Sequence, residues 1–406
     1  MWSARWIRCE RHPQYAQGHL RRALRPRRSK YPLVTFGYFS RVISLTYHIP
    51  LTRRKERGKF PHINFAAMIL MKITNVELIE VFVPYIAPIR NVGHGDWEHT
   101  IVKVHTDEGL VGLGEIWSPS DAIEQSVDGL IGKDPLMMDL ENASPPWQSA
   151  LYDIVAQAKE VPVWRLIGDK VRDKVAVAYW SCHMVPEETA KEAEKAAARG
   201  FTVHKLKAQA NDIVRQAELM TKATEGVDYA IRVDPNCGFK YPTTAARLAR
   251  ELAPYNIECF EDPVEKENFN VAWYSLLRHK TDIPQALHLT DPYNVLRAVK
   301  GDAVDRFNIS GNVATVKRCA AIAEAAGCPI WLQTAGLCLG IHAAFSTHLQ
   351  ATLTNDLLAC DELPFVRDND LIGGSLEFTV GHFIVPTRNG LGITLDADAV
   401  AHYRTR

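Results

Sequence analysis

Three charged side chains recur at one interval along the chain. Lys207, Asp234 and Glu261 are 27 residues apart each time, and each closes a short apolar segment typical of a β-strand. A strand, a loop, a helix and a second loop together take about that many residues in a βα-barrel. The interval therefore predicts that the three side chains lie at the carboxyl ends of successive parallel strands, where barrel enzymes build their active sites.

The residue types at these positions suggest a particular chemistry. A lysine that can lose a proton, next to two carboxylates that can hold a divalent cation, suggests abstraction of a proton from carbon beside a metal-bound carboxylate. The alternative is that the three groups are solvated charges at strand ends.

Composition limits the class of protein without deciding the chemistry. With 406 residues, 47% of them hydrophobic, the chain can bury one large core or two ordinary ones. Its eight cysteines form no CxxC pair and no Cys/His cluster with zinc spacing, so we expect reduced thiols. No apolar run reaches the roughly 18 to 20 residues that span a bilayer. We therefore expect a cytoplasmic protein with no membrane partner and no nucleic-acid partner for its catalytic part.

The net charge of zero conceals a strong asymmetry. Residues 1–67 hold 15 Lys and Arg against 2 acidic residues, so the remainder holds 32 basic and 45 acidic residues. The basic segment shows little helical or strand periodicity and no signal-peptide cleavage pattern. It is interpreted as a probable non-native or disordered extension: a start site assigned too far upstream, an Arg-rich transit peptide, or a disordered arm for nucleic acid or a membrane surface.

Regular structure is expected from residue 71 onward. Residues 72–83 alternate as in a β-strand, residues 100–117 indicate a hairpin, and residues 149–160 have helical spacing. This pattern predicts an α+β capping domain over residues 68–171.

Strand-like and helical segments alternate from residue 172 onward. Repeated βα units across about 200 residues indicate an α/β fold with a barrel, assigned to residues 172–378, and not an open sheet. Helices are expected at 187–199, 211–223, 243–253, 268–278 and 314–326. Residues 379–406 return to strand and turn, and we expect them to pack back on the capping domain.

Several separate stretches carry a resemblance to a known family. They are Asp107-Glu-Gly109 with Gly112-Leu-Gly-Glu115, Lys205-Leu-Lys207, Asp234-Pro-Asn236, Phe260-Glu-Asp-Pro263 and Gly390-Leu-Gly-Ile393. Each stretch alone would be weak evidence, but the order and spacing of the whole set match those of one family. From Met71 to its end the chain resembles the mandelate racemase and muconate lactonizing enzyme group of the enolase superfamily.

The resemblance implies a modified (β/α) TIM-type barrel with an N-terminal cap, bound Mg²⁺, and removal of the proton alpha to the carboxylate of a small substrate. It implies that Lys207 is the base and that Lys205 assists it and contacts the substrate carboxylate. The remaining implied roles are metal binding by Asp234 and Glu261 and substrate contacts by Asn236 and Glu362. Many members form homo-oligomers, so self-association is expected by analogy.

The chain departs from the family where a third carboxylate is expected. Leu289 stands there, and leucine cannot ligate a metal. Adding the 27-residue interval to Glu261 reaches His288, and imidazole is a common metal ligand, so His288 is the favoured third ligand. Asp291 and water are the alternatives. A histidine ligand would shift the preference from Mg²⁺ toward Mn²⁺, iron or zinc.

The opposite face of the barrel also departs from the family. Ser310 and Gln333 stand where the family places a second base, and neither is a strong base. Racemisation through two bases is therefore disfavoured, whereas elimination runs with one base. Dehydration of a small hydroxy or sugar acid is the favoured reaction, with Gln333 as a substrate contact. A racemase or epimerase, a cycloisomerase and a catalytically degenerate binding protein remain alternatives.

Overall fold

The computed structural model describes residues 71–406 apart from 93–97, 267–269, 334–338 and 362–363. The described residues fall within one compact unit, Leu70–Arg406. The basic segment 1–67 and Glu362 lie outside the described residues.

The first part of this unit is a small antiparallel sheet covered by a helix. The sheet has the order β1 (Ile73–Val81), β2 (His99–Thr106) and β3 (Val111–Ile116), and α3 (Pro145–Ala158) packs on it. A Cβ atom at Gly112 would lie 2.1 Å from the carbonyl oxygen of Ala150. A side chain at this position would therefore separate α3 from β3. Short helices complete this part: α1 (Ala87–Asn91), α2 (Asp121–Glu124), η1 (Pro135–Met137) and α4 (Trp164–Ile167).

The second part is a closed barrel of parallel strands. In chain order the strands are β4 (Lys174–Ser181), β5 (Val203–Lys207), β6 (Ala230–Asp234), β7 (Ile257–Glu261), β8 (Gln285–Leu289), β9 (Arg306–Ile309), β10 (Ile330–Leu332) and β11 (Cys360–Asp361). Each pairs with the next from β4 to β10. The ring closes because β11 pairs in parallel with β4 and a bridge joins Gln333 to Asp361.

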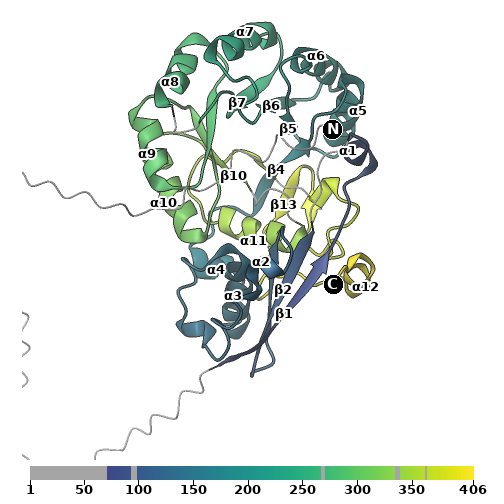
Figure 1. The fold of residues 1–406 in the computed structure, drawn as a ribbon, viewed down its shortest axis with the longest axis vertical. Helices are drawn as coiled ribbons and strands as arrows, with labels where there is room; N and C mark the ends of the chain where they lie inside the picture. The colour runs from purple at the N-terminus through teal and green to yellow at the C-terminus, as the bar shows by residue number, and fades with distance from the viewer. Residues whose placement is uncertain (1–70, 93–97, 267–269, 334–338, 362–363) are drawn as a thin grey trace, which may run out of the picture. The chain divides into compact units, whose positions relative to one another are not determined.

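Helices surround the strands, as Figure 1 shows. They are α5 (Pro186–Ala198), α6 (Ile213–Ala223), α7 (Pro242–Leu252), α8 (Val271–Lys280), α9 (Pro292–Lys300), α10 (Val313–Ala325) and α11 (Gly340–Gln350). The buried residues of α7 are Ala245, Leu248, Ala249 and Leu252. Their i, i+3, i+4, i+7 spacing produces one apolar face for the barrel wall. The predicted fold class, a modified barrel with an α+β cap, is confirmed.

Helix α9 is one of two barrel helices, with α11, that the predicted ranges do not include. Helix α9 begins directly after Asp291, whose carboxylate accepts a hydrogen bond from the backbone N–H of Asn294 at 2.9 Å. Pro292 occupies the first turn, where its missing N–H costs nothing. Asp291, one of the alternatives for a metal ligand, therefore acts as the N-cap of α9.

The end of the chain contacts the first part of the unit. After β12 (Phe378–Thr379) and β13 (His382–Ile384), α12 (Ala397–Tyr403) leads to residues that pair with β1. The carbonyl oxygen of Tyr403 accepts a hydrogen bond from the Phe82 N–H at 2.9 Å. The Thr405 N–H donates to the backbone carbonyl oxygen of Glu80 at 2.9 Å. Among the described residues no helix is long and apolar enough to cross a membrane.

His348 connects α11 to two segments that are distant in the sequence. Trp164 N–H of α4 donates to His348 Nδ1 at 3.2 Å, and Nε2 lies 3.1 Å from the carbonyl oxygen of Leu391. Because Nδ1 accepts, the ring hydrogen sits on Nε2 and donates to Leu391. Burial lowers the pKa of His348 to about 4, so the ring is neutral in the folded protein near neutral pH.

This neutral histidine predicts a loss of stability in mild acid. Between about pH 6.5 and pH 4, His348 binds a proton in the unfolded chain but not in the folded chain. The free energy of unfolding therefore falls as the pH drops toward 4. By about pH 4.5 the loss from His348 should reach roughly 2 kcal/mol. Urea unfolding of the wild type and of His348→Gln at pH 7 and at about pH 4.5 measures it. The amide of Gln can replace both hydrogen bonds without titrating, so equal losses in the two proteins would contradict this account.

Candidate active site

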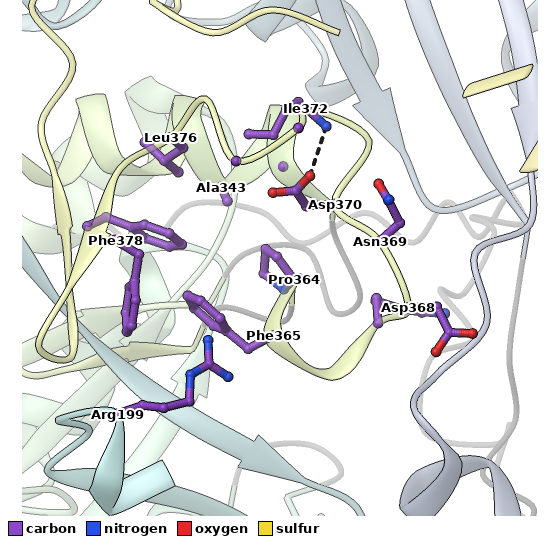
Figure 2. A pocket seen from close by; sticks show the side chains of 15 residues that line it. Arg199, Ala343, Pro364, Phe365, Asp368, Asn369, Asp370, Ile372, Leu376 and Phe378 are labelled. Carbon is purple, nitrogen blue, oxygen red and sulfur yellow. Dashed lines mark hydrogen bonds between the residues drawn. The ribbon is translucent and has the colours of Figure 1, made fainter. Parts of the chain in front are cut away.

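A pocket of about 540 Å³ lies between α11, the end of α5 and the loop that follows β11 (Figure 2). The Arg199 guanidinium there lies over the ring of Phe365, 4.8 Å from its centre. Asp370 accepts a hydrogen bond from the backbone N–H of Ile372 at 3.0 Å. None of the predicted site residues that the structure describes lines this pocket. Arg199 contacts an aromatic ring and Asp370 a loop backbone, and the predicted site residues lie elsewhere.

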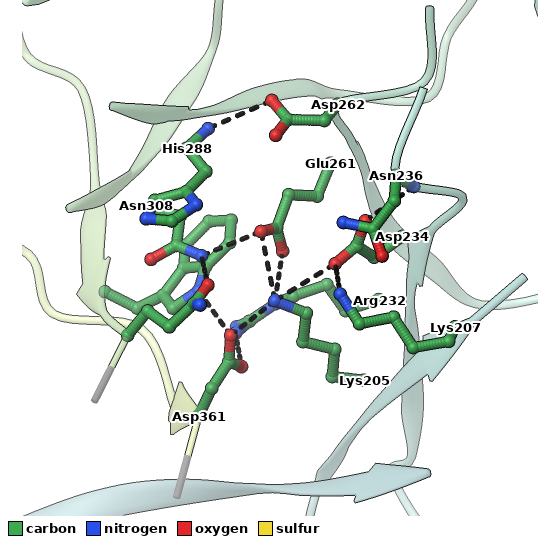
Figure 3. Close-up of polar contacts among 12 residues, drawn as sticks. Lys205, Lys207, Arg232, Asp234, Asn236, Glu261, Asp262, His288, Asn308 and Asp361 are labelled. Atoms are coloured by element: carbon green, nitrogen blue, oxygen red, sulfur yellow. Dashed lines mark hydrogen bonds and ion pairs between the residues drawn. The ribbon is translucent and has the colours of Figure 1, made fainter. Parts of the chain in front are cut away.

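Lys205 is the centre of a buried ion-pair cluster inside the barrel (Figure 3). Its Nζ lies 2.7 Å from Asp361 Oδ2, 2.9 Å from Glu261 Oε2 and 3.2 Å from Asp234 Oδ2. The four side chains are at most 2% exposed. Three carboxylates from three different strands therefore share one ammonium group away from water.

Strand register explains why Lys207 also reaches this cluster. The parallel pairing of β5 with β6 places Lys207 beside Asp234, and Lys207 Nζ lies 2.6 Å from Asp234 Oδ2. Lys205 lies two positions earlier, on the same face of the strand and deeper in the barrel. The Lys207 side chain is 25% exposed, and among the described residues it forms an ion pair with this single carboxylate. The 27-residue interval thus corresponds to direct pairing of neighbouring strands.

Burial and mutual attraction shift the pKa values of the cluster in opposite directions. Burial alone would lower the pKa of Lys205, but Asp361, Glu261 and Asp234 raise it well above its ordinary value. Burial raises the pKa of Glu261, and the charges of Asp234 and Asp361 add to that effect. Burial would also raise the pKa of Asp234, yet Lys207 and Lys205 hold it below its usual range. Lys205 therefore stays protonated near neutral pH.

Arg232 and Asp361 are parts of the cluster that the sequence did not reveal. Arg232 Nη1 lies 2.8 Å from Asp361 Oδ1, and Arg232 Nε lies 2.6 Å from Glu258 Oε2. Its guanidinium also lies 3.9 Å from the ring centre of Trp331. One signal was available, because Arg232 precedes Asp234 by two positions and so shares its strand face. No local signal marks Asp361, which adjoins the predicted Glu362.

Asn308 connects a predicted substrate contact to the cluster. Its Nδ2 donates to Glu261 Oε1 at 2.7 Å and to Gln333 Oε1 at 2.8 Å. Gln333 therefore lies at the edge of the site. Asn236 touches Asp234 through its backbone N–H, which donates to Oδ1 at 2.9 Å. Glu362 lies outside the described residues, so its predicted contact with the substrate stays a prediction.

His288 faces the same interior, but its ring binds another residue. The register of β8 and β9 pairs His288 with Asn308, whereas Leu289 pairs with Ile309 on the other face. The Nε2 atom of His288 lies 2.8 Å from Ser310 Oγ. Burial lowers the pKa of His288 to about 4, and the charge of Lys266 adds to this effect. The ring is therefore neutral and hydrogen bonded across to β9.

The donor set can be tested against the predicted divalent metal. Magnesium takes octahedral oxygen ligands, supplied by carboxylates and water. Asp234 and Glu261 offer carboxylates, but the ammonium of Lys205 contacts both of them. Among the described residues, no three His, Cys, Asp or Glu side chains are arranged to hold a metal ion. The residues as arranged do not fit a divalent cation held by three protein ligands, and His288 as third ligand stays a prediction.

The burial of Arg232 predicts a large effect of its removal on stability. Arg232→Met would leave Asp361 and Glu258 without their guanidinium partner inside the barrel, which should cost about 3–5 kcal/mol of unfolding free energy. Arg247→Met is the matched control, because Arg247 forms an exposed ion pair with Glu251 on α7. That change should cost less than about 1 kcal/mol. Urea unfolding of both variants gives the comparison, and equal losses would show that the buried pair is unimportant.

Comparison with known proteins places the chain among enzymes of one family. The family described as Enolase C-terminal domain-like matches residues 188–399. An N-succinyl-L-Arg/Lys racemase of Bacillus cereus is 27% identical over 369 residues, covering 81% of this chain and 97% of that protein. A D-xylonate dehydratase of Haloferax volcanii is 26% identical over 356 residues, covering 75% of this chain and 85% of that protein.

A solved structure gives the same picture of the fold. The muconate lactonizing enzyme from Pseudomonas fluorescens, complexed with muconolactone, superposes with a TM-score of 0.70 at 25% identity. The similarity covers 82% of this chain and all of that one. The matched proteins thus include a racemase, a dehydratase and a lactonizing enzyme on one architecture.

Proposed function

The chain belongs to the Enolase C-terminal domain-like family of enzymes, and we propose that it is a lyase that dehydrates a small hydroxy or sugar acid. The first step is removal of the proton alpha to the substrate carboxylate. The second is loss of a hydroxyl group from the neighbouring carbon. A racemase, a dehydratase and chloromuconate cycloisomerases are among its relatives, so family membership alone does not fix the reaction.

The observation that carries the proposal is the different surroundings of the two lysines. Lys205 contacts three carboxylates, which raise its pKa, so near neutral pH it is protonated and has no lone pair to accept a proton. Lys207 contacts one carboxylate, Asp234, and is partly exposed toward the mouth of the barrel. A base must reach the substrate and exist in its neutral form for part of the time. Lys207 is the lysine of the cluster whose side chain is open to the mouth of the barrel, so it is the one that can reach a substrate.

Lys205 suits a different task in the same reaction. Removing a proton from carbon leaves negative charge on the substrate carboxylate oxygens, and fixed charges in a dry site stabilise it strongly. The Lys205 ammonium is buried beside Lys207 on the same strand face. Its position supports a role in holding that charge. Superfamily enzymes generally use a divalent metal, typically Mg²⁺, for this purpose.

Elimination is favoured over racemisation because one base serves it. The positions across the site hold Asn308, Ser310 and Gln333, none of which is a base, and Nε2 of His288 is held by Ser310. Lys207 can take the alpha proton and return it to the departing hydroxyl, which leaves as water. The resulting enol then becomes a 2-keto acid by taking a proton from solvent. A sugar-acid dehydratase among the relatives adds support for this substrate class.

The decisive experiment is exchange of the alpha proton with deuterated water. A panel of hydroxy acids, sugar acids and N-acylamino acids is incubated with the protein, with added Mg²⁺ and separately with EDTA, and followed by proton NMR. Dehydration predicts a 2-keto acid with deuterium at the carbon that lost its hydroxyl. Racemisation would instead place deuterium at the alpha carbon of the unchanged acid.

Lys207→Ala should lower the rate of exchange by about 10²–10⁴-fold, because a positioned general base contributes that much. Lys191→Ala is the control, since Lys191 is exposed on α5 and pairs with Glu188. Exchange that survives in Lys207→Ala would transfer the role of base to another residue.

A carboxylate-binding protein without turnover is the second candidate. It is favoured by the neutralisation of Lys205 by acids and by the lack of a second base among the described residues across the site. Under this alternative no acid of the panel exchanges under either metal condition, while some acid still raises the melting temperature. That pair of results would overturn the proposed lyase.

A further inference from the structure

The carboxylates that the family would use to bind a metal already surround a positive charge. We propose that the Lys205 ammonium is the resident cation of this cluster, and that a divalent ion can enter between Asp234 and Glu261 only by displacing it. The folded protein then holds no divalent metal at this position. The inference concerns the binding of a cation and does not rest on the proposed function.

A divalent ion would compete with Lys205 for the same oxygen atoms. Nζ of Lys205 lies 3.2 Å from Asp234 Oδ2 and 2.9 Å from Glu261 Oε2. Divalent ions of this kind bind carboxylate oxygens at about 2.0–2.6 Å. An ion held by both oxygens would therefore be pressed against the ammonium, and like charges at such separation repel strongly in a site without water.

Asp361, which is fixed in turn by Arg232, holds Lys205 in place. Asp361 Oδ2 lies 2.7 Å from Nζ, and Asp361 Oδ1 is in turn fixed by Arg232 at 2.8 Å. The Lys205 side chain is 2% exposed, so it has no solvent to turn into. Moving it away would separate a buried charge from three partners, which is costly.

Among the described residues, the side chains near Asp234 and Glu261 do not complete a metal site. Asn308 turns its Nδ2, and not its Oδ1, toward Glu261, and an N–H donor cannot bind a cation. His288 is bonded through Nε2 to Ser310, and Leu289 lies on the outer face of β8. The third carboxylate of the cluster, Asp361, is already held by Arg232, so among the described residues Asp234 and Glu261 are left to form a weak site even before the ammonium is counted.

The wild-type protein provides the first test. After dialysis against EDTA, isothermal titration with Mg²⁺ and with Mn²⁺ should show no saturable binding at millimolar concentration. The melting temperature should be the same in EDTA as in either metal, and metal analysis of the purified protein should find far less than one equivalent. Stoichiometric binding that disappears in Glu261→Gln would overturn the proposal.

Lys205→Met provides the second test, since it removes the ammonium and keeps an unbranched apolar chain. Asp234, Glu261 and Asp361 then face one another without their shared cation, so the variant should melt lower in EDTA. It should also gain a saturable rise in melting temperature with Mn²⁺ or Mg²⁺, with at least tenfold tighter binding than the wild type. A folded Lys205→Met with no response to metal would contradict the proposal.

Lys266→Met is the matched control. The Lys266 side chain is 31% exposed and forms its ion pair with a single carboxylate, Asp262. Its loss should lower the melting temperature without creating a response to metal, and an equal response would show that any unpaired acid attracts the ion. If Lys205→Met does not fold in EDTA, the wild-type titration still decides the question. All readouts are binding and stability, so they separate this inference from the exchange assay for the lyase.

Discussion

The contact of one ammonium with three carboxylates is the constraint on which the interior of the barrel depends. Lys205, Asp234, Glu261 and Asp361 come from β5, β6, β7 and β11, so the ring of strands must close correctly for the charges to meet. A slip of one residue in any of these strands would turn a charged side chain into the helix layer. A buried charge that loses its partner costs several kcal/mol, so the cluster penalises wrong registers. The cluster thereby favours one closure of the barrel over closures in which a strand is shifted in register.

The sequence predicted the parts of this arrangement that repeat locally. The interval between Lys207, Asp234 and Glu261 reflects pairing of neighbouring strands, and the structure brings all three into one cluster. Helices with an apolar face, such as α7, were found within a few residues of their observed bounds. Such signals survive because they depend on residues close in sequence. The contribution of Asp361 depends on the last strand meeting the first across more than a hundred residues, and no local pattern encodes that meeting.

The departures from the family have a shared physical origin in strand geometry. Alternation along β8 turns His288 inward and Leu289 outward, so the residue at the family's carboxylate position does not face the barrel interior. The inward histidine is neutral and hydrogen bonded to Ser310, which is itself the residue at a position where the family has a base. The histidine beside the first departure and the serine at the second are thus joined by one hydrogen bond. Proximity along neighbouring strands, and not distance in the chain, decides which substitutions act together.

The two lysines of β5 show how one short motif can serve two purposes. Both lysines face the barrel interior because they are two positions apart on one strand. Lys205 lies deeper and is 2% exposed, whereas Lys207 is 25% exposed. At the deeper position an ammonium without partners would lower its pKa, and only the surrounding acids keep it charged. At the mouth a single acid leaves Lys207 open to the substrate. In the proposed reaction, the acids that keep Lys205 protonated therefore leave proton transfer to Lys207, since an ammonium group has no lone pair to offer.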